Sequence, residues 1–272
     1  MYNDLLGESS SFHETMAGQT VAYYSRKDYL EALKPEFFKS EIIGYDDIEI
    51  NSVSFIVNAV SSSGTILCLA DSIITTKVHD TIVRRLLDKM CYNPTANCVI
   101  SHTGVAALNK TNFQKEVFDY FSMTKENNIS VIADKIFKLI NQYAQPISLQ
   151  SDQTISFVLS GYDENLPVCY TIDYSADKFV MQRFSGNFFV VSGIESYKKI
   201  FLTSNYSKCN NNKCTYENLV DLYRSIDKIK EHFPDSDTVG GWLKTVEFSV
   251  DGVKIKDQSI PLSCNHLSRL EI

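Results

Sequence analysis

Two hydrophobic periodicities alternate along the chain in separate blocks, and their order limits the folds that the chain can adopt. Apolar residues recur at every second position in three blocks and at every third or fourth position in the blocks between them. Period two is typical of a strand with one buried face, and a period near ~3.6 is typical of an amphipathic helix. The order is strands, two helices, strands, two helices, strands. Such segregated runs predict an α+β layered fold with mostly antiparallel sheets, and not a doubly wound parallel sheet.

The first strand block opens on a hairpin, SVSFIVNAVSSSGTILCLADSIITTK, at residues 52–77. Two apolar runs flank the turn SSSG, and Asp71 then interrupts the second run. Ile48 and Ile50 alternate with charged residues just before it, and RLLDKMCY with NCVISHTG predicts a second strand pair around Asn93.

Two helices follow this block. Thr111 with Gln114 fits a capping box, and Ser130 is the expected N-cap of SVIADKIFKLINQYA, which Pro146 ends.

Two strand pairs and two further helices complete the chain. TISFVLSGYDENLPVCYTIDY predicts two antiparallel strands around the turn 161–165, and KFVMQRF and NFFVVSG predict two more. A short helix from Ser196 and a longer one over 217–232 precede the last hairpin, WLKTVEFSV and VKIKD.

The composition is typical of a globular protein, and it argues against some classes of binding partner. The 272 residues suffice for one large domain, which we place at 51–272, after a leader over 1–50 with one short helix at 25–38. A net charge of −7 argues against nucleic acid as a partner, and no apolar run approaches the length of a membrane helix. The start of the chain lacks the pattern of a signal peptide, and seven scattered cysteines suit reduced thiols, so we expect a cytoplasmic protein. Cys209 and Cys214 have no second pair of metal ligands at a suitable spacing, so we expect neither a metal site nor a cofactor.

Five short motifs remain after phosphate loops, HExxH and the G-x-S-x-G elbow are excluded. In order, they are Ala70-Asp71-Ser72, Asp88-Lys89-Met90, Ser101-His102-Thr103-Gly104, Val191-Ser192-Gly193 and TVGG at 238–241. With SGYDENLPVCYTID at 160–173, their order and separations resemble the proteasome-subunit family of the N-terminal-nucleophile hydrolases, over about residues 50–256. The resemblance implies a four-layer α-β-β-α sandwich and assembly with like or related subunits.

The resemblance also implies a site. Its positions are Ser54 as nucleophile, Asp71 and Lys89 as a charged pair, Gly104 as an oxyanion donor through its backbone N–H, Ser192 near the free amine, and Asp235 or Asp237 as a last carboxylate. Each also has a purely structural interpretation: Ser54 as a strand residue, Asp71 as a strand terminator, and Lys89 in a solvated ion pair. His102 is expected to be structural.

The chemistry requires a free α-amine on the nucleophile. A hydroxyl is a weak nucleophile, and an adjacent α-amine with a pKa near ~8 can serve as its base. Val53 stands where active family members have the glycine that precedes the cut, and Ser54 stands where they have threonine. Two hypotheses follow: a peptide or amide hydrolase with its leader removed, acting on a polypeptide substrate, or a non-catalytic assembly or binding module with its leader attached.

Overall fold

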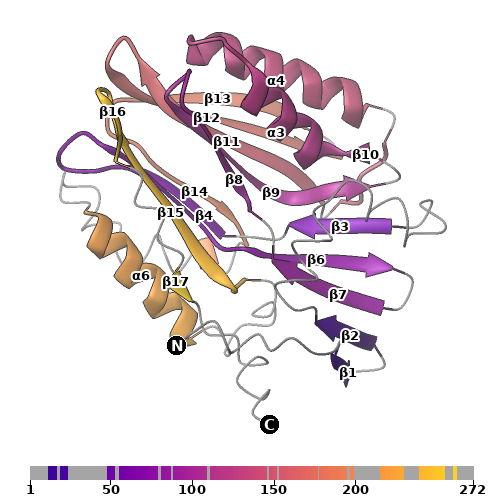
Figure 1. Cartoon of the computed structure of the whole chain (residues 1–272). Coiled ribbons are helices and arrows are strands. Elements are labelled where there is room, and N and C mark those ends of the chain that lie inside the picture. Colours follow the sequence, from indigo (N-terminus) through magenta and orange to yellow (C-terminus); the bar gives the residue numbers. More distant parts are fainter. Residues whose placement is uncertain are drawn as a thin grey trace.

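The structure is a computed structural model of the chain. It describes residues 12–16, 19–23, 48–52, 55–78, 81–86, 88–108, 111–145, 147–151, 153–176, 178–194, 197–198, 215–229, 239–254 and 260–261. Within these residues, the fold combines a few α-helices with mostly antiparallel β-sheets (Figure 1). The expected combination of helices with antiparallel sheets is therefore confirmed.

Eleven of the described strands form one sheet. Its main path runs β1 (Phe12–Met16), β2 (Gln19–Tyr23), β7 (Thr81–Leu86), β6 (Ile73–Val78), β3 (Ile48–Ser52), β9 (Cys98–Leu108), β11 (Thr154–Asp163), β12 (Leu166–Ser175) and β13 (Phe179–Ser185). Both β8 (Met90–Asn93) and β10 (Thr111–Asn112) pair with β9 off this path. Among these pairs, β2 with β7 is parallel and the others are antiparallel.

The second sheet has six described strands and is antiparallel. Its order is β14 (Phe189–Gly193), β4 (Phe55–Val60), β5 (Ile66–Ala70), β15 (Trp242–Ser249) and β16 (Gly252–Lys254), with β17 (Ile260–Pro261) paired to β15. The two strands predicted from KFVMQRF and NFFVVSG are thus found in different sheets, β13 in one and β14 in the other.

Strands β3 to β6 form a two-stranded ribbon, of which β3 and β6 lie in one sheet and β4 and β5 lie in the other. In the eleven-stranded sheet, Asn51 of β3 pairs with Thr75 of β6. Ile56 of β4, five residues later, pairs with Ala70 of β5, five residues earlier, in the six-stranded sheet. The register is therefore unchanged across the bend. The hairpin predicted at 52–77 is confirmed, and it bends where the chain changes sheets.

Apolar side chains pack each sheet against helices and against the other sheet. Residues of α3 (Phe113–Met123) and α4 (Ile129–Ala144) share a buried cluster with β9, β11 and β12. On the other side of the molecule, α6 (Tyr216–Ile229) shares a cluster with β4 and β5 (Figure 1). A third cluster joins the two sheets, with Val60, Ile66, Val99, Val158 and Phe248 among its members.

The helix caps differ by one or two residues from those expected. The side chain of Asn112, not Thr111, caps α3 by accepting from the backbone N–H of Lys115 at 2.8 Å. Asn128, not Ser130, caps α4. Both predicted caps were therefore wrong, because the cap directly precedes the first helical residue: Thr111 lies one residue too early, and Ser130 already lies inside α4.

Parts of the expected leader lie within the larger sheet. Strand β2 pairs with β7, and β3 lies between β6 and β9, so the expected boundary between residues 50 and 51 falls inside β3. The helices expected at 25–38 and from Ser196, and the pair Cys209 and Cys214, lie wholly or mostly outside the described residues.

The cap assignment predicts a contrast between adjacent residues. Asn112→Ala removes the acceptor of the Lys115 N–H, so we expect the free energy of unfolding to fall by about 1 kcal/mol. Thr111→Ala is the matched control, and it should change this free energy by less than about 0.5 kcal/mol. Urea denaturation of both variants measures the difference, and equal losses would contradict the assignment.

Candidate active site

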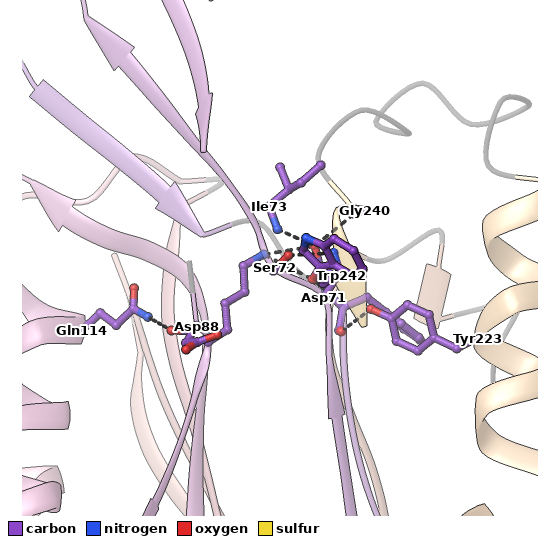
Figure 2. Close-up of polar contacts among 10 residues, drawn as sticks. Asp71, Ser72, Ile73, Asp88, Gln114, Tyr223, Gly240 and Trp242 are labelled. Atoms are coloured by element: carbon purple, nitrogen blue, oxygen red, sulfur yellow. Dashed lines mark hydrogen bonds and ion pairs between the residues drawn. The ribbon is translucent and has the colours of Figure 1, made fainter. Parts of the chain in front are cut away.

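Asp71 lies at the bend of the ribbon, between β5 and β6, with its side chain fully buried. Its Oδ1 accepts the backbone N–H of Phe55 at 3.1 Å, and its Oδ2 accepts those of Ile73 at 3.3 Å and Gly240 at 3.1 Å (Figure 2). One carboxylate therefore joins the start of β4, the start of β6 and the segment that leads into β15.

Lys89 completes this arrangement from the segment before β8. Its Nζ lies 3.2 Å from Oδ1 and 3.1 Å from Oδ2 of Asp71, and both side chains are fully buried. Burial raises the pKa of Asp71 and lowers the pKa of Lys89, while the attraction between the two charges opposes both shifts. The interpretation of Lys89 as part of a solvated surface ion pair is therefore wrong.

Phe55, the first residue of β4, is also held by contacts with Tyr223 and Tyr197. The hydroxyl of Tyr223, from α6, donates to the carbonyl of Phe55 at 2.7 Å. The Phe55 ring packs 5.3 Å from the ring of Tyr223 and 5.8 Å from that of Tyr197, measured between centroids. Phe55 is thus held through its N–H, its carbonyl and its ring, directly after the expected nucleophile in the chain.

The segment beside Asp71 is also bonded to β15. The hydroxyl of Ser72 accepts the backbone N–H of Trp242 at 2.8 Å, and the Ser72 N–H donates to the carbonyl of Gly240 at 3.2 Å (Figure 2). Gly240 and Gly241 both have positive φ, at 156° and 75°. The second value is a left-handed conformation that favours glycine, so the double glycine shapes the turn that meets Asp71.

Ser192 belongs to a second polar group, which we call the hydroxyl cluster: Thr103, Ser156 and Ser192. The Oγ of Ser192, from β14, lies 3.3 Å from Thr103 Oγ1 and 3.3 Å from Ser156 Oγ, so it joins the two sheets. Ser156 pairs with Thr103 on one side and Asp173 on the other, and its hydroxyl donates to Asp173 Oδ1. Ser192 itself pairs with Ile56, the second residue of β4. The hydroxyl cluster thus lies beside the strand that starts at Phe55.

Gly104 lies in β9, where no other residue fits. Its φ is 90°, and a Cβ at this position would come within 2.0 Å of the carbonyl oxygen of Thr154. It pairs with Ser52, the last residue of β3. The expected oxyanion donor is therefore held beside the end of β3.

The structure brings some of the expected site residues together and leaves others undescribed. Asp71 and Lys89 are in direct contact, and Gly104 and Ser192 are paired with strands on the two sides of the β3–β4 link. Ser54, Asp235 and Asp237 lie outside the described residues. Sequence reasoning gave no role to Thr103, although it lies in one of the five motifs, and it missed Ser156 and Asp173, whose strands contain other polar residues as well.

His102 lies inside β9 and is fully buried. Its ring is fully buried, 4.6 Å from that of Phe157, and within the described part of the chain neither ring nitrogen has a hydrogen-bond partner. Burial, with a smaller effect of the Lys89 charge, lowers the pKa of His102 to about 3.

No protein family matches the sequence, and no curated protein matches it. Within the described residues, no helix is long and apolar enough to cross a membrane, and no group of three or more His, Cys, Asp or Glu side chains could hold a metal ion.

Loss of the Lys89 ammonium should leave the Asp71 carboxylate buried without its counterion. We expect Lys89→Met to lower the free energy of unfolding by about 3–5 kcal/mol. Lys115→Met is the matched control, because Lys115 and Asp119 form an ion pair with side chains 50% and 48% exposed, and its loss should cost less than about 1 kcal/mol. Urea denaturation near neutral pH measures both, and a small effect at Lys89 would contradict the buried pair.

The lowered pKa of His102 predicts acid sensitivity. The folded state keeps His102 neutral down to about pH 3, whereas the unfolded chain takes up a proton near pH 6.5. Stability from this residue is therefore full above pH 6.5 and is lost as the pH falls, by about 2 kcal/mol between pH 7 and pH 5. His102→Leu should remove this component, so between pH 7 and pH 5 the unfolding free energy of the parent, measured in urea, should fall by about 2 kcal/mol more than that of the variant. Parallel pH profiles would contradict it.

Proposed function

We propose that the chain is a proteasome-subunit-like member of the N-terminal-nucleophile fold, a four-layer α-β-β-α sandwich, and that it hydrolyses peptide or amide bonds with Ser54 as nucleophile. One observation carries the proposal. The buried Asp71 carboxylate binds both the Lys89 ammonium and the backbone N–H of Phe55, the residue that follows Ser54. A fully buried lysine and carboxylate are costly to retain, and such pairs cluster at functional sites.

The strand register supports Ser54 as the position in question. The pairing of Ile56 with Ala70 sets Phe55 opposite Asp71, so Ser54 is the next residue beyond the described end of β4. The Lys89 ammonium carries three N–H groups and lies within 3.2 Å of both oxygens of Asp71. We expect the same positive charge to act on a hydroxyl at this end of the strand.

The reaction would follow a cut between Val53 and Ser54. The freed amine of Ser54 takes the hydroxyl proton, and the oxygen attacks the substrate carbonyl carbon to form a tetrahedral oxyanion. The backbone N–H of Gly104 stabilises the oxyanion, and the positive charge of Lys89 favours the ionised hydroxyl. The amine then gives its proton to the leaving amine, and water hydrolyses the resulting ester. Ser192, with Asp235 or Asp237, orients the Ser54 amine.

A second candidate is a non-catalytic assembly or binding module that keeps its leader. Strand β3 favours it, because loss of residues 1–53 would take away the strand that joins β6 to β9. Under either candidate we expect a cytoplasmic protein that associates with itself or with related subunits. Only the hydrolase would also have a polypeptide or amide substrate.

Self-processing tests the proposed hydrolase. We expect the purified parent chain to contain a species that starts at Ser54, and Ser54→Ala to abolish it, because the hydroxyl is the attacking group. Intact mass under denaturing conditions and N-terminal sequencing measure the cut.

Ser62→Ala is the matched control, since Ser62 is an exposed serine of the β4–β5 turn, and it should be processed like the parent. A parent that stays uncut would reject the hydrolase and favour the module. A cut that persists in Ser54→Ala would reject Ser54 as its own nucleophile.

A further inference from the structure

Strand β3 is bonded to the rest of the molecule along both edges. On the β6 edge, the antiparallel pairs run from Ile48 with Val78 to Asn51 with Thr75. On the β9 edge, they run from Glu49 with Leu108 to Ser52 with Gly104, with a register shift after Ile50. Few five-residue segments offer more backbone bonding, because a central strand satisfies its N–H and C=O groups on two sides.

The slot that β3 fills lies inside the sheet. In the strand order, β1, β2, β7 and β6 lie on one side of β3, and β9, β11, β12 and β13 lie on the other. An empty slot would expose unpaired backbone groups on both β6 and β9, and such edges are unfavourable in water and prone to pair with other chains. A second strand of the same segment, β2, pairs with β7 on the far side of β6.

The chain on the other side of the Val53–Ser54 bond has its own anchors. Phe55 is bonded to Asp71 and to Tyr223, and β4 pairs with β5 and β14. Both sides of the bond are therefore held independently of the bond itself. Its loss removes a covalent link at the bend and none of the strand pairs described.

We infer that residues 1–53 act as a strand-donating subunit: when the chain is cut at the Val53–Ser54 bond by any agent, this segment stays bound in the slot between β6 and β9. The strand that fills this slot is β3 of the same chain, and it is bound through its backbone pairs with β6 and β9. The inference goes beyond the proposed function, because it concerns the bonding of β3 and not the means of the cut. With the proposed function, it makes the mature enzyme a two-chain protein.

The test separates retention from self-processing. A recognition sequence for a site-specific protease is placed between Val53 and Ser54 in a Ser54→Ala chain, which is then cut with that protease. We expect native mass spectrometry and gel filtration at about 1 µM to show both pieces together, and denaturing mass spectrometry to show two separate chains. Departure of the 1–53 piece under native conditions would overturn the inference, whether or not the proposed hydrolase is correct.

A substitution in β3 tests the slot itself. Ile50→Pro removes an N–H from a central strand, so the cut protein should lose the 1–53 piece, and Ile50→Val, which keeps the N–H, should retain it. If the uncut proline variant does not fold, a synthetic peptide of residues 46–53 replaces it. Added in large excess while the cut protein refolds from urea, this peptide should compete with the 1–53 piece for the position between β6 and β9, and its Ile50→Pro analogue should not. Equal behaviour of the two variants, or of the two peptides, would overturn the role of β3.

Discussion

The carboxylate of Asp71 is the interaction on which the bend between the two sheets depends. Where a ribbon leaves one sheet for another, some backbone N–H groups have no partner strand. At this bend, Asp71 accepts three backbone N–H groups, two from Phe55 and Ile73 of the ribbon and one from Gly240, which precedes β15. A carboxylate buried in this way is stable only if its charge is balanced, and Lys89 supplies the balance. Neither half of the pair can therefore change alone without cost to the fold.

Local patterns predicted most of the strands and helices, and their errors have local causes. The hairpin at 52–77 and the strands β11 and β12 follow from alternation. The turn between β11 and β12 was predicted over 161–165, but Asp163 pairs with Leu166, so the loop is only Glu164-Asn165, both with positive φ. Asn favours this conformation, but Glu does not. Glu164 adopts it because a two-residue hairpin loop requires it, and the residue type alone does not predict this. The predicted caps were wrong because residue type alone does not fix where a helix begins: Thr111 and Asn112 are both good N-cap residues.

The candidate site was less accessible to sequence reasoning, because it is made by strands far apart in the chain. Lys89 follows Asp88 and an arginine pair, so its neighbours in the sequence suggest a charged surface, but in the structure it is fully buried against Asp71. Ser192 was expected near the site, but its contacts depend on β14 joining β4 in the second sheet instead of following β13. Thr103 and Ser156 become neighbours only once β9 and β11 pair. Motif order identified candidate positions, and pairing between distant strands decided their contacts.

The ribbon of β3 to β6 has a consequence for folding. Its pairs join residues that are close in the sequence, such as Ile56 with Ala70, whereas β5 with β15 and β4 with β14 join residues far apart. Local pairs close small loops and form at low entropic cost, so the ribbon is suited to form before either sheet is complete. The ribbon, once formed, would offer unpaired strand edges on which the other strands of both sheets can pair. The two sheets would then form together and not one after the other.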